Sequence, residues 1–220
     1  MTPRTPRVHH YADGEFMLAH GPKDGPQLLV LQPFFEEMNR CRAMIAAICR
    51  GLGGRGIGCW LPDLPGTGES LRALDGITFD DWLGAVDSAS AAIREATGVI
   101  PATVAIRGGA LLDHRVAQRA WRLAPTTGRS LLSDLRRSAL ASGSDPAHPA
   151  GYSLSPSLDE ALAKAEPVPR DDLRSVRLAP DDRPADHRIE GSPLWRRPEP
   201  ATDDLMQANL IDEIARWANT

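Results

Sequence analysis

The chain has 220 residues, of which 42% are hydrophobic and 25% charged. These fractions are ordinary for a globular protein, so they exclude wholesale disorder and predict a single domain over residues 1–220. A formal net charge of −4 without a cluster of basic residues argues against nucleic-acid binding, and no apolar stretch is long enough to span a bilayer.

Residues 1–14 contain arginines and histidines but no apolar run, which predicts a flexible N-terminal tail and no secretory signal. The three cysteines are odd in number and form no C-x-x-C pair, so neither a disulfide framework nor a zinc site is expected. We therefore expect a cytoplasmic protein with no metal and no cofactor.

The first half alternates short apolar runs with segments of helical periodicity. The glycines from Gly51 end the first helical pattern, whereas Thr78 is a natural N-cap for a second helix that ends near Gly98. The Gly108-Gly109 pair precedes a third helix, expected from Ala110 to about Arg119. The expected strands are residues 27–32, 57–62, 99–106 and 121–124.

The second half is richer in Pro, Asp and Arg, which predicts loops and a shortened C-terminal half. Residues 126–175 are expected to form a cap or insertion. The expected helices are residues 131–140, 158–165 and 202–218, and the expected short strands are 176–179 and 188–190. The alternation of strands and helices predicts an α/β fold with a mostly parallel sheet flanked by helices.

This order of elements resembles the α/β-hydrolase superfamily over residues 16–122. The most specific local similarity is the sequence D-L-P-G-T-G-E-S at residues 63–70, which resembles the loop after the fourth strand of that fold. Its two glycines permit a tight turn into the next helix. A phosphate-binding loop is the competing interpretation of G-T-G, but the lysine and the spacing of a P-loop are absent.

Three short motifs narrow the resemblance. They are P-F-F-E-E-M-N at 33–39, D-D-W-L at 80–83 and G-Y-S-L-S-P at 151–156. Together they resemble the second ortholog group of hydrolase-like proteins associated with exosortase A systems, which are linked to PEP-CTERM sorting and exopolysaccharide production. The resemblance implies a protein partner in such a pathway.

The superfamily places its nucleophilic serine in a G-x-S-x-G turn between a strand and a helix. The matching residues here are A-I-R-G-G at 105–109, so Arg107 stands at the position of the nucleophile. A guanidinium cannot be deprotonated in a protein and cannot attack a carbonyl. The small residues around Arg107 still predict the sharp turn, and the basic residue is a feature of the group that the chain resembles.

The other members of a catalytic triad are also hard to find. Asp181 or Asp182, after the strand at 176–179, could supply the acid, and His187 is the last histidine of the chain. Asp182 and His187 are the catalytic candidates. Without a serine, however, they would have nothing to activate, and the alternative is that both are solvated loop residues.

Glu36 and Glu37 lie at the expected start of a helix, where carboxylates stabilise the helix dipole. The sharper hypothesis is that one of them pairs with Arg107, since both lie at the carboxyl ends of neighbouring strands. On that hypothesis Arg107→Ala abolishes the binding of an anion without unfolding the domain. The candidate ligand-binding residues are accordingly Phe34, Glu36, Glu37, Arg107 and Gly108.

Two functions follow from these residues. The favoured one is an accessory protein that has lost the triad and binds a small anionic molecule or a partner protein. The alternative is an active hydrolase that cleaves an acyl ester or thioester by a non-standard mechanism, with water activated by Glu36, Glu37 or Asp182.

Overall fold

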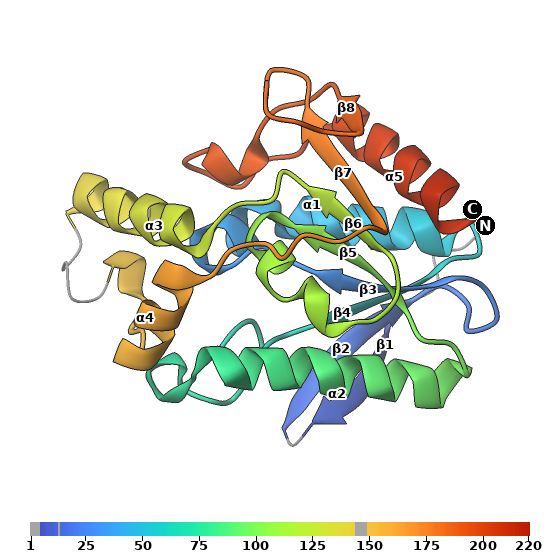
Figure 1. Ribbon diagram of the computed structural model, residues 1–220, viewed down its shortest axis with the longest axis horizontal. Helices are drawn as coiled ribbons and strands as arrows, with labels where there is room; N and C mark the ends of the chain where they lie inside the picture. The colour runs from blue at the N-terminus through green and yellow to red at the C-terminus, as the bar shows by residue number, and fades with distance from the viewer. Residues whose placement is uncertain (1–4, 13, 144–148) are drawn as a thin grey trace.

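A computed structural model describes residues 5–12, 14–143 and 149–220. These residues form an eight-stranded sheet in the order β1-β2-β4-β3-β5-β6-β7-β8, with helices on both faces (Figure 1). The predicted fold class is therefore confirmed.

The six strands β4, β3, β5, β6, β7 and β8, named in their order across the sheet, run parallel to one another. They are mostly apolar because both faces of the sheet are covered. The loops at their carboxyl ends lie together at one edge of the sheet. These strands are β3 (Gln27–Leu31), β4 (Gly58–Pro62), β5 (Ala102–Ile106), β6 (Ala120–Leu123), β7 (Leu173–Leu178) and β8 (His187–Ile189).

The N-terminal segment differs from its prediction. Within the expected tail of residues 1–14, Arg7–Ala12 form strand β1, which pairs antiparallel with β2 (Glu15–His20), and β2 continues the sheet beside β4. The strand escaped detection because β1 is an edge strand whose side chains are mostly exposed, so its sequence has no apolar run. Tyr11 is the buried anchor of β1, and its hydroxyl donates a hydrogen bond to the Asp63 carbonyl.

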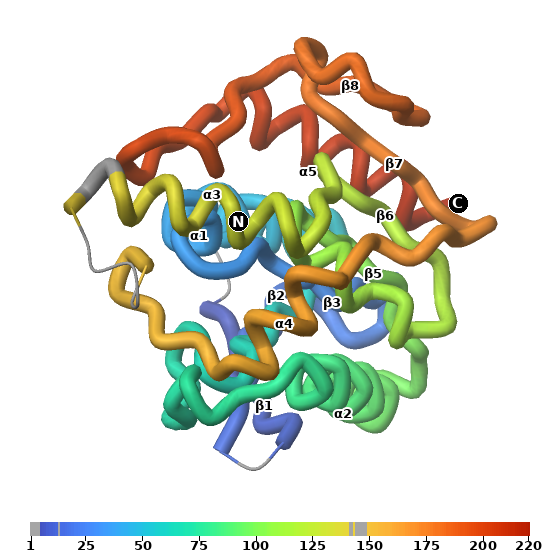
Figure 2. The backbone as a smooth tube through the Cα atoms, turned by 60° about the vertical axis from the view of Figure 1, so that its left-hand side comes forward, coloured from blue at the N-terminus to red at the C-terminus, as the bar shows by residue number. Residues whose placement is uncertain are grey.

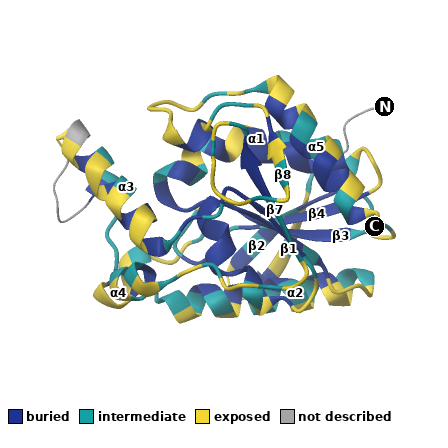
Figure 3. Cartoon of the chain, turned by 45° about the horizontal axis from the view of Figure 1, so that its top comes forward, coloured by how far each residue is buried: buried dark blue, intermediate teal, exposed yellow. Residues whose placement is uncertain are grey.

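Two layers of helices cover the sheet. Helices α1 (Phe35–Gly53) and α5 (Asp204–Ala218) pack on one face, and α2 (Phe79–Thr97) packs on the other. Helices α3 (Gly128–Ser142) and α4 (Pro156–Lys164) pack against each other beside the carboxyl ends of the strands (Figure 2). The strands are buried between the two layers, while the helices expose their outer faces (Figure 3). Thr78 caps α2 as predicted, since its hydroxyl accepts a hydrogen bond from the Asp81 N–H at 3.1 Å.

The segment after β5 is the second departure from prediction. Instead of one helix from Ala110 to Arg119, the chain forms two short 3-10 helices, η2 (Arg107–Leu111) and η3 (Asp113–Arg115). Asp113 in η3 is fully buried and pairs with Arg122 in β6, with a nitrogen–oxygen distance of 2.7 Å. Periodicity along the chain gives no sign of this contact with a neighbouring strand.

The region between β6 and β7 contains α3, the 3-10 turn η4 (Pro149–Gly151) and α4. It lies within the span 126–175 that the sequence analysis assigned to a cap or insertion. After β8 the chain forms the 3-10 turn η5 (Leu194–Arg196) and then α5. Within the described part of the chain, no helix is long and apolar enough to cross a membrane.

Candidate functional site

The carboxyl ends of β3, β5 and β6 carry the same unusual backbone conformation. Phe35 has a φ of 55°, Arg107 has 55° and Ala124 has 45°, all in the left-handed region that side chains disfavour. Strand β5 lies between β3 and β6, so these three residues follow adjacent strands. Such strain persists only where the surroundings impose it, and it is concentrated at functional sites.

The sharp turn predicted around Arg107 is present. A Cβ atom on Gly108 would lie 2.6 Å from Leu131 Cδ1 and 2.9 Å from Phe34 Cδ2, and a Cβ atom on Gly109 would lie 2.2 Å from the Leu31 carbonyl oxygen. Each distance is too short for a side chain. The backbone of β3 therefore leaves no room for a side chain at Gly109, and a side chain at Gly108 would have to displace Leu131 and Phe34.

Arg107 is held by Glu37, which confirms the predicted pairing. Its Nη2 donates to Glu37 Oε1 at 2.8 Å, and its Nε donates to Glu37 Oε2 at 3.1 Å. The exposed fractions of the two side chains are 4% and 9%. Glu37 accordingly occupies the two-pronged edge of the guanidinium that an anionic ligand would use.

The remaining contacts of the guanidinium come from other strand ends. Arg107 Nη1 donates to the Ala124 carbonyl at 3.1 Å, and the guanidinium carbon lies 5.2 Å from the centre of the Trp195 ring. The latter is a cation–π contact supplied by the loop after β8. Arg107 thus joins α1, the end of β6 and η5 at the carboxyl end of β5.

Burial raises the pKa of the Glu37 carboxyl above its ordinary value, and the hydrogen bond and positive charge of Arg107 oppose that rise. Glu36, by contrast, is half-buried in the first turn of α1. Its Oε2 lies 3.8 Å from Nη2 of Arg40, one turn further along the helix. Its position fits the predicted interaction with the helix dipole.

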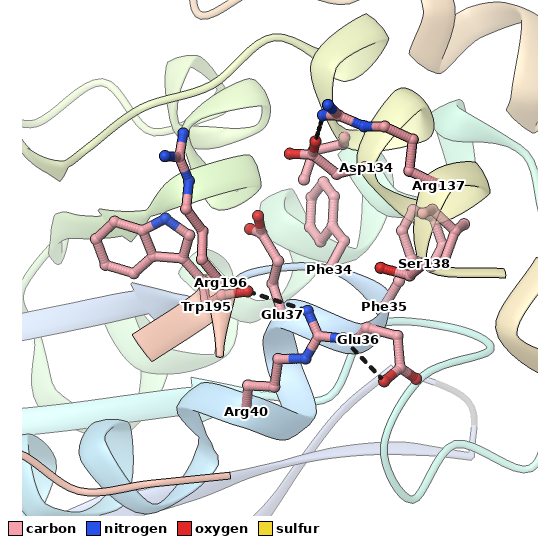
Figure 4. Close-up of a pocket in the computed structure, with 12 residues that line it drawn as sticks. Phe34, Phe35, Glu36, Glu37, Arg40, Asp134, Arg137, Ser138, Trp195 and Arg196 are labelled. Atoms are coloured by element: carbon pink, nitrogen blue, oxygen red, sulfur yellow. Dashed lines mark hydrogen bonds and ion pairs between the residues drawn. The ribbon is translucent and has the colours of Figure 1, made fainter. Parts of the chain in front are cut away.

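A cavity of about 420 Å³, called the α3 cavity below, opens beside this pair between α1, α3 and η5. Figure 4 shows Trp195 and Arg196 on one side and Asp134 and Arg137 on the other. Its lining residues are Phe34, Phe35, Glu36, Glu37, Arg40, Leu131, Asp134, Leu135, Arg137, Ser138, Trp195 and Arg196. Three of the predicted ligand-binding residues are among them: Phe34, Glu36 and Glu37.

A second cavity of about 340 Å³, called the β7 cavity below, lies on the other side of Trp195. Arg107 faces it, together with Ala124 and loop residues after β7 and β8. Its lining residues are Arg107, Ala124, Leu178, Pro180, Asp181, Asp182, Arg183, Pro193, Trp195 and Arg196. Trp195 and Arg196 line both cavities.

Asp182 and His187 are not brought together as a triad would require. Asp182 is exposed at the rim of the β7 cavity, whereas His187 is in β8 and its Nε2 lies 3.9 Å from Glu213 of α5. In the register of the sheet, His187 of β8 lies in one row with Val176 of β7, Leu123 of β6 and Ile106 of β5. Strand β8 is three strands away from β5, so the backbones of His187 and Ile106 are about 14 Å apart at the usual strand spacing. The alternative of solvated loop residues fits Asp182, whereas His187 is a half-buried strand residue.

Asp181 is bound instead to arginines of its own loop. It accepts hydrogen bonds from Arg177 Nη1 at 2.9 Å and from Arg183 Nη2 at 2.7 Å. These arginines hold the pKa of the Asp181 carboxyl well below its ordinary value. Among the described residues, no three His, Cys, Asp or Glu side chains are grouped closely enough to hold a metal ion.

The three motifs that narrowed the family resemblance meet in space. The ring of Phe34 lies 4.7 Å from that of Trp82, and the ring of Phe35 lies 5.4 Å from that of Tyr152. Asn39 Nδ2 also donates to the Tyr152 hydroxyl at 3.2 Å. The motifs at 33–39, 80–83 and 151–156 therefore form one aromatic cluster beneath the α3 cavity.

Several residues of this site are not among the predicted ligand-binding residues, namely Ala124, Leu131, Leu135, Trp195 and Arg196. The available signal was Trp195, a large aromatic residue inside a segment otherwise rich in Pro, Asp and Arg. Such a residue in a loop indicates burial against the core, and it is 4% exposed.

No known family profile and no curated protein matches the chain. Among solved structures, Est1E from Butyrivibrio proteoclasticus aligns with a TM-score of 0.58 at 13% identity, covering 98% of this chain and 99% of that one. Est1E with bound ferulic acid aligns with a TM-score of 0.52 at 14% identity, covering 78% and 77%. The chain therefore has the α/β-hydrolase fold.

A proline iminopeptidase-related protein from Thermus thermophilus aligns with a TM-score of 0.46 at 22% identity, covering 74% of this chain and 58% of that protein. The chain likewise spans 48% of a 2-hydroxy-6-oxo-6-phenylhexa-2,4-dienoate hydrolase from a Rhodococcus species. It thus spans about half the length of these two structures.

Proposed function

We propose that this protein is an α/β-hydrolase-fold binding protein that lacks serine-nucleophile chemistry. The observation that carries the proposal is the buried Arg107–Glu37 pair at the nucleophile position. The left-handed backbone of a nucleophile turn is retained there, but the side chain is a cation already bound to a carboxylate. A binding role uses the cavity at this edge of the sheet and needs no attacking group.

The serine among the described lining residues of the α3 cavity does not supply a nucleophile. Ser138 lines the α3 cavity from α3, but the described lining residues include no histidine that could take its proton. A serine without such a base is a poor nucleophile. The cavity therefore favours binding over covalent catalysis.

The ligand is proposed to be a small anionic molecule. Phe34, Glu36 and Glu37 line the α3 cavity, and Gly108 lies against Phe34 and Leu131, which also line it. Est1E has been solved with ferulic acid, an aromatic carboxylic acid, so hydroxycinnamates are suitable first probes.

We also propose that the protein belongs to an exosortase system and binds a cytoplasmic partner of the exopolysaccharide pathway. The support is the resemblance of the three motifs, which lie together in one cluster. An exosortase gene beside the coding sequence is the expected finding. A neighbourhood without one, in the source genome and its relatives, would contradict this narrower assignment.

The binding role is tested with a fluorophosphonate probe and with p-nitrophenyl esters of increasing chain length. We expect no labelled protein and no turnover above the buffer rate, beside a serine esterase of the same fold as the positive control. Labelling of a specific serine would refute the proposal.

A second candidate function is hydrolysis by an activated water molecule, and one observation favours it. Glu37 faces the α3 cavity and burial raises its pKa, which suits a carboxylate that takes a proton from water. Hydroxide would attack an ester or thioester carbonyl, and the alcohol or thiol would leave with a proton. Ester turnover that resists the fluorophosphonate and disappears in Glu37→Gln would establish this function instead.

A further inference from the structure

The charges that line the α3 cavity are almost completely paired. Each of its three acidic side chains has an arginine partner: Glu36 lies 3.8 Å from Arg40, Glu37 lies 2.8 Å from Arg107, and Asp134 pairs with Arg137. These contacts leave little net charge for a ligand to meet. A charged ligand must therefore be recognised by a side chain outside these three pairs.

Arg196 is that side chain. It lines the cavity, and within the described residues its guanidinium makes no ion pair and no hydrogen bond. Its backbone is nevertheless firmly placed, since its N–H donates to the Pro193 carbonyl at 2.9 Å and the preceding Leu194 and Trp195 are buried. Arg40 Nη1 also donates to the Trp195 carbonyl at 3.2 Å. In the part of the chain that the structure describes, Arg196 is thus a cation without a partner, on a hydrogen-bonded turn at the cavity edge.

The wall next to Arg196 is apolar. Its carbon surface comes from Phe34, Phe35, Leu131, Leu135 and Trp195. Of the two cavities that Arg196 lines, the α3 cavity has three aromatic side chains among its described lining residues, Phe34, Phe35 and Trp195, whereas the β7 cavity has Trp195 alone. The body of a ligand held by Arg196 is therefore favoured on the α3 side.

We infer that the α3 cavity binds a carboxylate with an aromatic or acyl body, and that Arg196, rather than Arg107, binds the carboxylate. The inference rests on the proposed binding function and names its ligand class. A guanidinium binds a carboxylate through two parallel hydrogen bonds, and the edge of Arg107 that would do so is occupied by Glu37.

The test compares trans-cinnamate with trans-cinnamamide, which share a body and differ in charge, by titration calorimetry. Wild type is expected to bind the carboxylate about tenfold more tightly than the amide. Arg196→Gln should bind both equally, whereas Arg197→Gln, one residue away and outside both cavities, should behave as wild type. Acetate, which lacks the body, should show no measurable binding at the same concentration.

Three outcomes overturn the inference. They are equal binding of cinnamate and cinnamamide by wild type, unchanged discrimination in Arg196→Gln, and no binding of either compound. None of them affects the fluorophosphonate result, which decides independently whether the protein uses a serine nucleophile. Failure of the ligand class is thereby distinguished from failure of the proposed function.

Discussion

Arg107 and Glu37 are charged side chains with exposed fractions of only 4% and 9%. Removing both from water is costly, and their mutual contact offsets the cost only while both are present. The pair is consequently a structural element as well as part of the site. This changes the expectation for Arg107→Ala, because loss of Arg107 leaves Glu37 buried without its partner and destabilises the domain.

We predict that Arg107→Met lowers the free energy of unfolding by about 3–5 kcal/mol, because it leaves an uncompensated buried carboxylate. Urea titration followed by circular dichroism measures the change. The double variant Arg107→Met with Glu37→Leu should regain most of the loss, since it removes both charges.

The matched control for this prediction is Arg55→Met. Arg55 pairs with Asp212 at the surface, where the two side chains are 45% and 55% exposed, so its loss should cost less than about 1 kcal/mol. Equal effects of Arg107→Met and Arg55→Met would show that the Arg107–Glu37 pair is not a buried, coupled unit.

The sequence alone supported a contact between Arg107 and either Glu36 or Glu37, because adjacent parallel strands end at the same edge of a sheet. It could not choose between the two glutamates. The choice depends on the rotation of α1 about its axis, which is set by the packing of residues such as Met44 and Ile48 against the sheet. Glu37 consequently points inward, while Glu36 faces Arg40.

Among the elements, α3 and α4 approach each other unusually closely at one point. Gly128, at the start of α3, lies so near α4 that a Cβ atom would be 1.9 Å from the Leu162 carbonyl oxygen. The backbone there cannot yield as a flexible side chain could. The approach also allows the Gly128 N–H to donate to the Ala165 carbonyl at 2.9 Å.

We predict that Gly128→Ala lowers the free energy of unfolding by about 1–3 kcal/mol or more, because α3 and α4 must separate to admit the methyl group. Gly84→Ala is the control, since Gly84 is exposed within α2 and a Cβ atom there meets nothing within 4 Å. That control should gain about 0.5–1 kcal/mol from helix propensity. Thermal unfolding of both variants checks the opposite signs, and a neutral Gly128→Ala would contradict the close approach.

Elements with strong local signals were correctly predicted. The buried strand β3 and the capped helix α2 are examples, because their apolar periodicity and their caps reside within each segment. Strand β1 and the 3-10 turns after β5 were not predicted correctly. Strand β1 depends on its pairing with β2, and the 3-10 turns contain Asp113, which contacts Arg122 of a neighbouring strand.

At the scale of the whole molecule, the reactivity of the three free cysteines measures whether one of the two core layers is closed to solvent. Cys41, Cys49 and Cys59 are all fully buried in the layer between the sheet and helices α1 and α5. Burial also raises the pKa of the Cys41 thiol to about 12. Since the thiolate is the reactive form, this thiol is protected both by burial and by its protonation.

We predict that a thiol reagent such as DTNB at pH 8 leaves the three cysteines of the native protein unmodified and modifies all three in concentrated urea. Labelling at intermediate urea should follow the unfolding transition seen by circular dichroism, because the layer opens only when the domain unfolds. Rapid modification of one thiol under native conditions would show instead that α1 or α5 separates from the sheet locally.

The sequence was sufficient for the α/β architecture and for the glycine-containing turn at residues 107–109. Each of these depends on residues that are adjacent or periodic along the chain. The partner of Arg107, the unpaired Arg196 beside an apolar wall and the separation of His187 from Arg107 followed only from the folded chain. They depend on side chains from α1, η2, α3, β8 and η5 that are distant in sequence, and their distances are set by how the helices pack on the sheet.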